Sequence, residues 1–186
     1  YGGMPIVREV IAPTDFSERP RNSFSDCVDS ILVDCDRATQ FLPDYYTDES
    51  KLGRATRIAA LALKARVLLY AASPLFNTNR PYMAFPGHED LIGYGNYDRE
   101  RWKKAADAAK AAIDAAVSSG HYKIHNTGNP EKDYEDVWTI PNNEEIILGN
   151  MKYRNFKTTN RPLVANLPTW AMNKAWGDAG LYVTFN

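Results

Sequence analysis

The sequence predicts a mostly α-helical protein of stacked helical repeats with long irregular insertions. Three segments place apolar residues every three or four positions, and each ends at a proline or a glycine. The segments between them are long and rich in Gly, Pro and Asn. We therefore expect helices at about residues 23–42, 54–73 and 99–119, followed by an irregular region over 120–186.

The first expected helix, 23–42, carries an amphipathic stripe. Ser23 and Asp26 match a capping box, and Pro43 ends the segment. Cys27 and Cys35 lie eight residues apart, which is about 12 Å along a helix and exceeds the roughly 7 Å that a disulfide allows. We expect two buried thiols. The stripe consists of Phe24, Cys27, Val28, Ile31, Leu32, Cys35, Ala38 and Leu42.

The other two expected helices differ in polarity. The segment 54–73, between Gly53 and Pro74, is apolar nearly all round and is expected to be buried on most sides. The segment 99–119 starts after Asp98 as N-cap and has an alanine-rich apolar face. Trp102 belongs to this face and is placed to form a hydrophobic staple with Tyr97.

The connections contain further features. Residues 75–97 form an irregular stretch of more than 20 residues, a length that often indicates function. After residue 120, the run 145–148 is the best candidate for a short strand. The acidic residues Asp133, Glu135 and Asp136 are expected in a solvated loop, and His121 and His125 are not placed to ligate a metal, so we expect no cofactor.

Composition gives no support to two classes of protein. Lys and Arg number 22 and Asp and Glu 23, so the net charge of −1 gives no support to a nucleic-acid partner. No run of 18 apolar residues is present, so no segment is expected to span a membrane.

Two helix starts match a tetratricopeptide-type pattern, in which a large residue is followed by small or apolar residues three, four and seven positions later. The starts are 78 residues apart rather than about 34, so long insertions would interrupt the repeat. Generic antiparallel helices are an equally acceptable interpretation. The matching positions are Phe24, Cys27, Val28 and Ile31, and Trp102, Ala105, Ala106 and Ala109.

Five segments follow one another in a characteristic order: Tyr1-Gly-Gly-Met-Pro5, the 23–43 helix, Gly53-Arg-Ala-Thr56 leading into the apolar helix and Ser73-Pro-Leu-Phe-Asn77, Tyr97-Asp-Arg-Glu-Arg-Trp102, and Asn142-Asn-Glu-Glu-Ile-Ile147. This order resembles the SusD/RagB family of Bacteroidetes nutrient-binding lipoproteins, across essentially the whole chain but only a middle part of a longer member. The resemblance implies a SusD-like fold, so that residues 1–186 would be a partial domain of a larger α protein.

The family resemblance also implies a function. Members bind glycans on the outer face of the outer membrane, are anchored by an N-terminal lipid and form the lid of a TonB-dependent SusC-like transporter. This chain departs from the pattern because it lacks the lipidated cysteine and the C-terminal half. Its ends look cut, so we expect a piece of a longer protein.

Aromatic residues in the irregular segments are the candidate glycan contacts, because sugar faces stack on aromatic rings while amides bind hydroxyls. The resemblance favours the C-terminal stretch, where Trp170, Trp176 and Tyr182 lie near Asn173; Tyr82, Phe85 and Tyr94 in the long connection form a second set. For both sets, an ordinary packing role is the competing interpretation.

An enzyme is the less favoured class. Adjacent Glu144 and Glu145 would point to opposite faces of a strand, and the chain has no nucleophile-elbow, P-loop or zinc-protease motif. The sequence therefore predicts a glycan-binding protein without catalytic activity. The alternatives are a tetratricopeptide-type scaffold that binds only protein and, as the weakest, a glycoside hydrolase.

Overall fold

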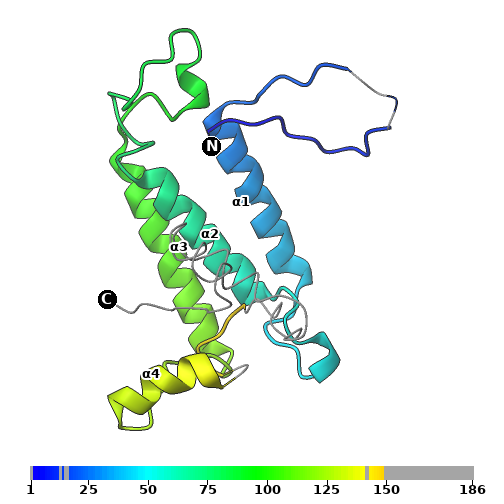
Figure 1. The fold of residues 1–186 in the computed structure, drawn as a ribbon, viewed down its shortest axis with the longest axis vertical. Helices are drawn as coiled ribbons and strands as arrows, with labels where there is room; N and C mark the ends of the chain where they lie inside the picture. The colour runs from blue at the N-terminus through cyan, green and yellow to red at the C-terminus, as the bar shows by residue number, and fades with distance from the viewer. Residues whose placement is uncertain (1, 13, 15–16, 141–142, 149–186) are drawn as a thin grey trace, which may run out of the picture. The chain divides into compact units, whose positions relative to one another are not determined.

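The computed structural model describes residues 2–12, 14, 17–140 and 143–148. Within them the chain forms four α-helices and two short 3₁₀ helices, and no strand. This confirms the mostly α fold. The elements, in chain order, are α1 (Phe24–Phe41), η1 (Glu49–Lys51), α2 (Arg57–Ala72), η2 (Glu89–Leu91), α3 (Arg99–Ser118) and α4 (Pro130–Thr139) (Figure 1).

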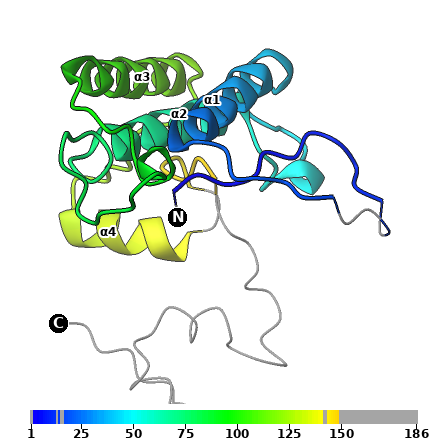
Figure 2. The ribbon, with the colours of Figure 1, turned by 90° about the horizontal axis from the view of Figure 1, so that it is seen from above.

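Helices α1, α2 and α3 form one antiparallel layer with α2 in the middle, packed against both neighbours (Figures 1 and 2). The central position suits the most apolar helix, whose Ile58 is fully buried. Within the described residues, however, this layer keeps part of its apolar surface exposed. Leu63 and Leu69 of α2 are about half exposed, at 51% and 52%, so the expectation that this helix is covered on most sides is wrong for the part of the chain described.

Side-chain caps set the helix starts. The Ser23 hydroxyl accepts the Asp26 backbone N–H at 3.0 Å while the Asp26 carboxylate accepts the Ser23 N–H, which confirms the capping box. Asp98 caps α3 as expected. Helix α2 begins at Arg57 rather than at residue 54, because the hydroxyl of buried Thr56 accepts the Ala59 N–H and makes Thr56 the cap.

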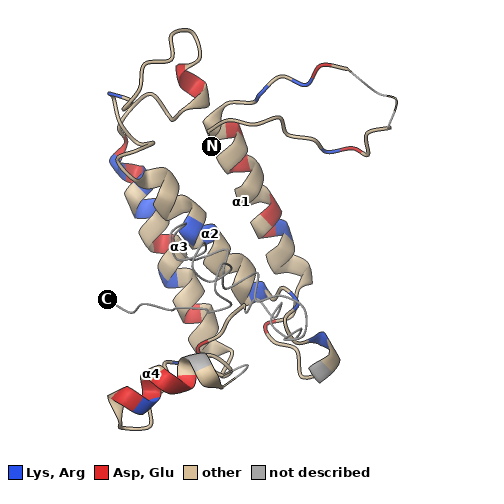
Figure 3. Cartoon of the chain, viewed as in Figure 1, with Lys and Arg blue, Asp and Glu red and all other residues tan. Residues whose placement is uncertain are grey.

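Residues 120–148 differ from the irregular loop that the sequence predicts. Asn129 caps helix α4 and Pro130 occupies its first turn, so the three acidic residues expected in a loop lie on a helix. In Figure 3, much of the α4 ribbon has the colour of acidic residues. Residues 145–148 form no strand either, because the Asn143 side chain accepts the Glu145 N–H and bends the chain into a turn.

An aromatic cluster joins α1 to the segment that follows α2. Phe24 stacks on Phe76 with ring centroids 4.5 Å apart and meets Tyr94 edge-on at 5.1 Å, and Val28 and Ala71 complete the buried core. The two cysteines are unbridged, as expected. Cys35 is buried, whereas Cys27 is half-buried and bonds the backbone of Met4 through its sulfur.

The N-terminal segment passes through a gap that only glycine fits. The Gly3 N–H donates to the Leu91 carbonyl at 2.6 Å. A β-carbon on Gly3 would lie 2.0 Å from the Asn22 carbonyl oxygen, and one on Gly2 would lie 2.2 Å from that of Leu91. The Gly2-Gly3 pair therefore ties the start of the chain to the long connection between α2 and α3.

Candidate functional site

Asn77 bonds the two ends of the long connection between α2 and α3 to each other, and we call this point of closure the neck. Its side chain is only 2% exposed and forms four hydrogen bonds. The amide nitrogen donates to the carbonyls of Ala72 and Asp98, at 3.3 and 2.9 Å. The amide oxygen accepts the Asp98 N–H and a guanidinium N–H of Arg101, both at 2.7 Å. The end of α2 and the start of α3 are thus joined through one side chain.

Arg101 completes this clamp. Its guanidinium donates to Asn77, to the Asn96 carbonyl at 2.8 Å and to the Asn96 side chain at 2.9 Å. It also lies 3.8 Å above the centre of the Tyr94 ring, a cation–π contact. Burial raises the pKa of the Tyr94 phenol, while the nearby Arg101 charge opposes that shift. The backbone at both sides of the neck is therefore held in place.

A pocket of about 400 Å³ opens beside the neck. Asn79 shapes one wall, because its side-chain oxygen accepts the Tyr97 N–H at 2.9 Å and leaves the amide NH₂ without a described partner. The lining residues are Pro74, Asn77, Thr78, Asn79, Arg80, Tyr97 and Trp102.

The pocket combines aromatic rings with polar donors. Tyr97 is 54% exposed and Trp102 37%, so Trp102 is not in the buried stripe of α3, where the sequence had placed it. The stripe is instead buried at Ala105 and Ala112. Exposed rings beside an amide and a guanidinium match what a sugar requires: a flat apolar surface and directed hydrogen-bond donors.

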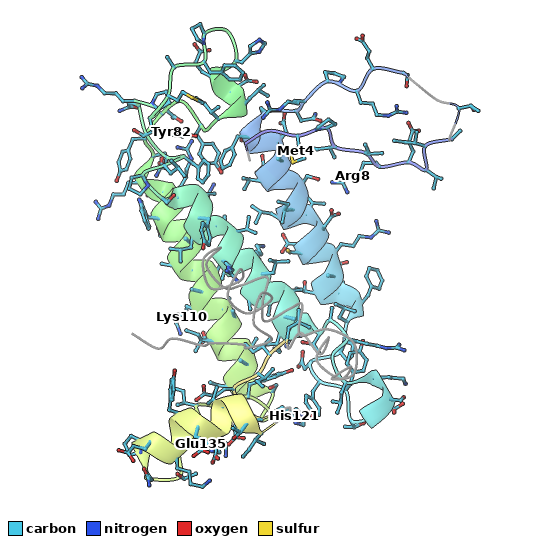
Figure 4. All side chains as sticks on the ribbon, in the orientation of Figure 1. Met4, Arg8, Tyr82, Lys110, His121 and Glu135 are labelled. Atoms are coloured by element: carbon cyan, nitrogen blue, oxygen red, sulfur yellow. The ribbon has the colours of Figure 1, made fainter. Side chains whose placement is uncertain are left out.

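The residues that the sequence predicts as glycan contacts have different positions. Tyr82 projects from the connection and is 72% exposed, but it does not line the pocket (Figure 4). Tyr94 packs between Phe24 and Arg101, so one of its faces is already occupied. Trp170, Asn173, Trp176 and Tyr182 lie outside the described residues.

Sequence reasoning missed the pocket because its residues are distant in the chain. Asn79 and Arg80 precede Tyr97 and Trp102 by about 20 positions, and the contact depends on closure of the connection. The available signal was Asn77: an asparagine three residues after the helix-ending pair Ser73-Pro74 can bridge to the next helix cap.

A second polar cluster surrounds His125, at the other end of α3. One ring nitrogen lies 2.9 Å from the Glu144 carboxylate and the other lies 3.1 Å from that of Asp136. Lys132 also bonds Asp136, at 2.9 Å. Hydrogen bonds from Glu144 and Asp136 raise the His125 pKa, and the pKa values of both carboxyls are lowered. Because both nitrogens are occupied, the ring links α4 to residues 143–146 and has no position free for a substrate.

Other classes of site find little support in the described part of the chain. No cluster of His, Cys, Asp and Glu there could hold a metal ion. The helices found there are also too short or too polar for any of them to cross a membrane.

An apolar groove of about 570 Å³ lies between α2, α3 and the segment after α3. Alanines of α2 and α3 line it together with Ile113 and Ile124, which are 63% and 82% exposed. Lys123, Glu144 and Glu145 are its charged lining residues. The groove contrasts with the pocket at the neck, because it offers few hydrogen-bonding groups.

Comparison with solved structures identifies proteins that are similar to this chain. The chain is 29% identical to a SusD-like protein, BF3747, from Bacteroides fragilis NCTC 9343, with a TM-score of 0.55 over 80% of this chain and 22% of that one. The chain has a SusD-like fold. It is also 35% identical to the protein BT4246, with a TM-score of 0.61 over 74% of this chain and 24% of that one. For a structure of selenomethionine BT4246, the sequence identity is 33% and the TM-score is 0.56.

The SusD-like chain spans about a quarter of the length of these solved structures, 24% of BT4246. The family models contain no match to it, and neither do the curated proteins.

Proposed function

We propose that this SusD-like chain belongs to a glycan-binding protein without catalytic activity. The observation that carries the proposal is the pocket at the neck, where two exposed aromatic rings meet an amide and a guanidinium in a SusD-like fold. The apolar face of a sugar ring would stack on Tyr97 or Trp102. Asn79 and Arg80 would donate hydrogen bonds to its oxygens.

The clamped neck suits such a role. Asn77 and Arg101 hold both sides of the pocket in place before any ligand arrives, so the protein loses little conformational entropy on binding. Tyr82, on the same connection, is proposed as an outer contact. Tyr94, Trp170, Asn173, Trp176 and Tyr182 remain predicted contacts of the whole protein.

In the whole protein, we propose that the captured oligosaccharide passes to a TonB-dependent SusC-like transporter. The protein would lie on the outer face of the outer membrane, attached through an N-terminal lipid. These proposals rest on the SusD-like relationship.

The alternative is a tetratricopeptide-type scaffold that binds only protein. The apolar groove between α2 and α3 is the observation that favours it, because a surface with exposed isoleucines and few polar groups suits a protein segment better than a sugar.

Affinity electrophoresis against a panel of polysaccharides separates these functions. We expect retention on at least one polysaccharide, and we expect Trp102→Ala and Tyr97→Ala to weaken it. Phe41→Ala removes a ring that is 75% exposed on α1, outside the pocket, and should bind like wild type. Thermal unfolding of each variant shows whether any lost binding reflects lost folding.

Two outcomes would contradict the proposal. Equal retention of wild type, Trp102→Ala and Tyr97→Ala would remove the pocket from the binding site. New reducing ends after incubation with the retained polysaccharide, if they persist after repurification, would instead indicate an enzyme.

A further inference from the structure

We infer that the pocket at the neck selects anionic glycans, through a salt bridge from Arg80 to a carboxylate or sulfate group on the sugar. The inference rests on the proposed function and names the ligand class of the same site. Among the described residues that line the pocket, Arg80 alone carries a charge.

The guanidinium of Arg80 has no partner in the described part of the chain. Its backbone is fixed, because its N–H donates to the Thr78 hydroxyl at 3.1 Å and its carbonyl accepts that hydroxyl at 3.2 Å. Its side chain forms no ion pair or hydrogen bond with the described residues. Arg101, Arg57 and Lys64, in contrast, are each bonded to a neighbouring side chain, so what sets Arg80 apart from other exposed cations such as Arg37 is its place in the pocket.

The other lining groups do not neutralise this charge. Asp98, which follows Tyr97 in sequence, uses its carboxylate to cap α3, and neither Asp98 nor Glu100, two positions before Trp102, lines the pocket. Asn79 adds amide donors, and its oxygen is already taken by the Tyr97 N–H. The pocket thus presents donors and one positive charge, a set that favours an oxyanion over a neutral hydroxyl.

An arginine suits both sources of negative charge on a sugar. Its planar fork donates two parallel hydrogen bonds to a carboxylate, and it can bind a sulfate in the same way. The chain as a whole does not attract anions, because its net charge is −1. A preference for acidic glycans would therefore have to come from a local site.

The test compares matched acidic and neutral polysaccharides by affinity electrophoresis at about 0.15 M salt, where long-range attraction is screened. The carboxylate arm uses polygalacturonate and its methyl ester, and the sulfate arm uses dextran sulfate and dextran. The proteins are the wild type, Arg80→Gln and Arg37→Gln. Arg37→Gln is the matched control, because it removes the same charge as Arg80→Gln from an exposed position on α1 outside the pocket.

We expect retention by an acidic member of the panel, with the neutral counterpart held about tenfold more weakly, as for loss of one charge-assisted bond. Arg80→Gln should remove that difference, and Arg37→Gln should keep it. Whether the carboxylate arm or the sulfate arm responds identifies the acidic group.

Equal retention of acidic and neutral forms, or an unchanged preference in Arg80→Gln, would overturn the inference. If neutral polysaccharides bind and Trp102→Ala weakens them, the proposed function stands while the anionic selectivity is wrong. If nothing in either the matched pairs or the wider panel is retained, the proposed function fails as well.

Discussion

Two polar clusters in the described part of the chain, one at each end of α3, perform the same task with different chemistry. The Asn77 cluster joins α2 to α3 through an amide and the permanently charged Arg101. The His125 cluster joins α4 to residues 143–146 through an imidazole between two carboxylates. None of the hydrogen-bonding groups of the Asn77 cluster titrates near neutral pH, whereas the His125 cluster depends on an imidazole, which does.

This difference indicates which region is fixed and which can respond to solution conditions. Asn77 is 2% exposed and both of its side-chain polar atoms are hydrogen-bonded. The side chains of Glu144 and Lys123 around His125 are more accessible, at 30% and 73%. The pocket lies beside the fixed cluster, which is where a preorganised binding site is expected.

Asn77→Ala should have the largest effect. It leaves the Asp98 N–H and the Arg101 guanidinium without their buried acceptor, and we expect a loss of about 2–4 kcal/mol in the free energy of unfolding, as for unsatisfied buried donors. Urea unfolding followed by circular dichroism measures it. Asn79→Ala, which removes one exposed bond, is the matched control and should cost much less. Equal losses for the two variants would show that Asn77 is not the centre of the neck.

Arg101→Lys should have the next largest effect. A lysine keeps the charge but lacks the planar fork with which Arg101 bonds Asn77 and Asn96, and its stacking on Tyr94 is weaker. We expect about 1–2 kcal/mol of destabilisation from lost charge-assisted bonds. Thermal unfolding, with Arg37→Lys as control, measures it. A fully stable Arg101→Lys would show that charge alone suffices.

His125→Gln should have a smaller effect that depends on pH. The His125 pKa is raised in the folded state, so its stabilising contribution is complete below the unfolded value of about 6.5 and is lost as pH rises through the folded pKa. The pKa values of Asp136 and Glu144 are lowered, so their contributions are lost only in acid. Hydrogen exchange of α4 amides should therefore speed up above neutral pH in wild type.

The same measurement on His125→Gln provides the control. Its exchange in α4 should be faster than wild type at pH 6 and equal to it at pH 9, after correction for intrinsic exchange rates. A wild-type profile without pH dependence would contradict the assignment of a protonated His125 to this cluster. Amides at the Asn77 neck serve as the internal reference and should not respond.

Lys110→Gln should have the smallest effect. Lys110 and Asp114 form an exposed pair on α3, with side chains 75% and 57% exposed. Such pairs contribute about 0.3–0.5 kcal/mol, so thermal unfolding should shift little. A shift in the unfolding temperature as large as that of Arg101→Lys would mean that charges on α3 contribute more to stability than the Asn77–Arg101 contacts do.

The sequence predicts most of the helical layer because the responsible interactions are local. Ser23 and Asp98 cap α1 and α3 through residues two or three positions away, and apolar periodicity identifies the faces. Helix α4 was missed even though Asn129 and Pro130 are a start signal. Its ten residues are too short and too polar for periodicity to stand out.

Only the tertiary structure decides the pocket. Asn79 meets Tyr97, and Arg80 faces the same hollow as Trp102, because Asn77 closes about 20 residues of chain between them. Trp102 shows the limit of pattern reasoning: it falls on the apolar face of α3, yet it remains 37% exposed because the layer ends there. By itself the sequence determines where helices begin and which side chains are available, because caps and periodicity act within a turn. Which of those side chains meet depends on loop closure, and that is set by contacts between residues far apart in the chain.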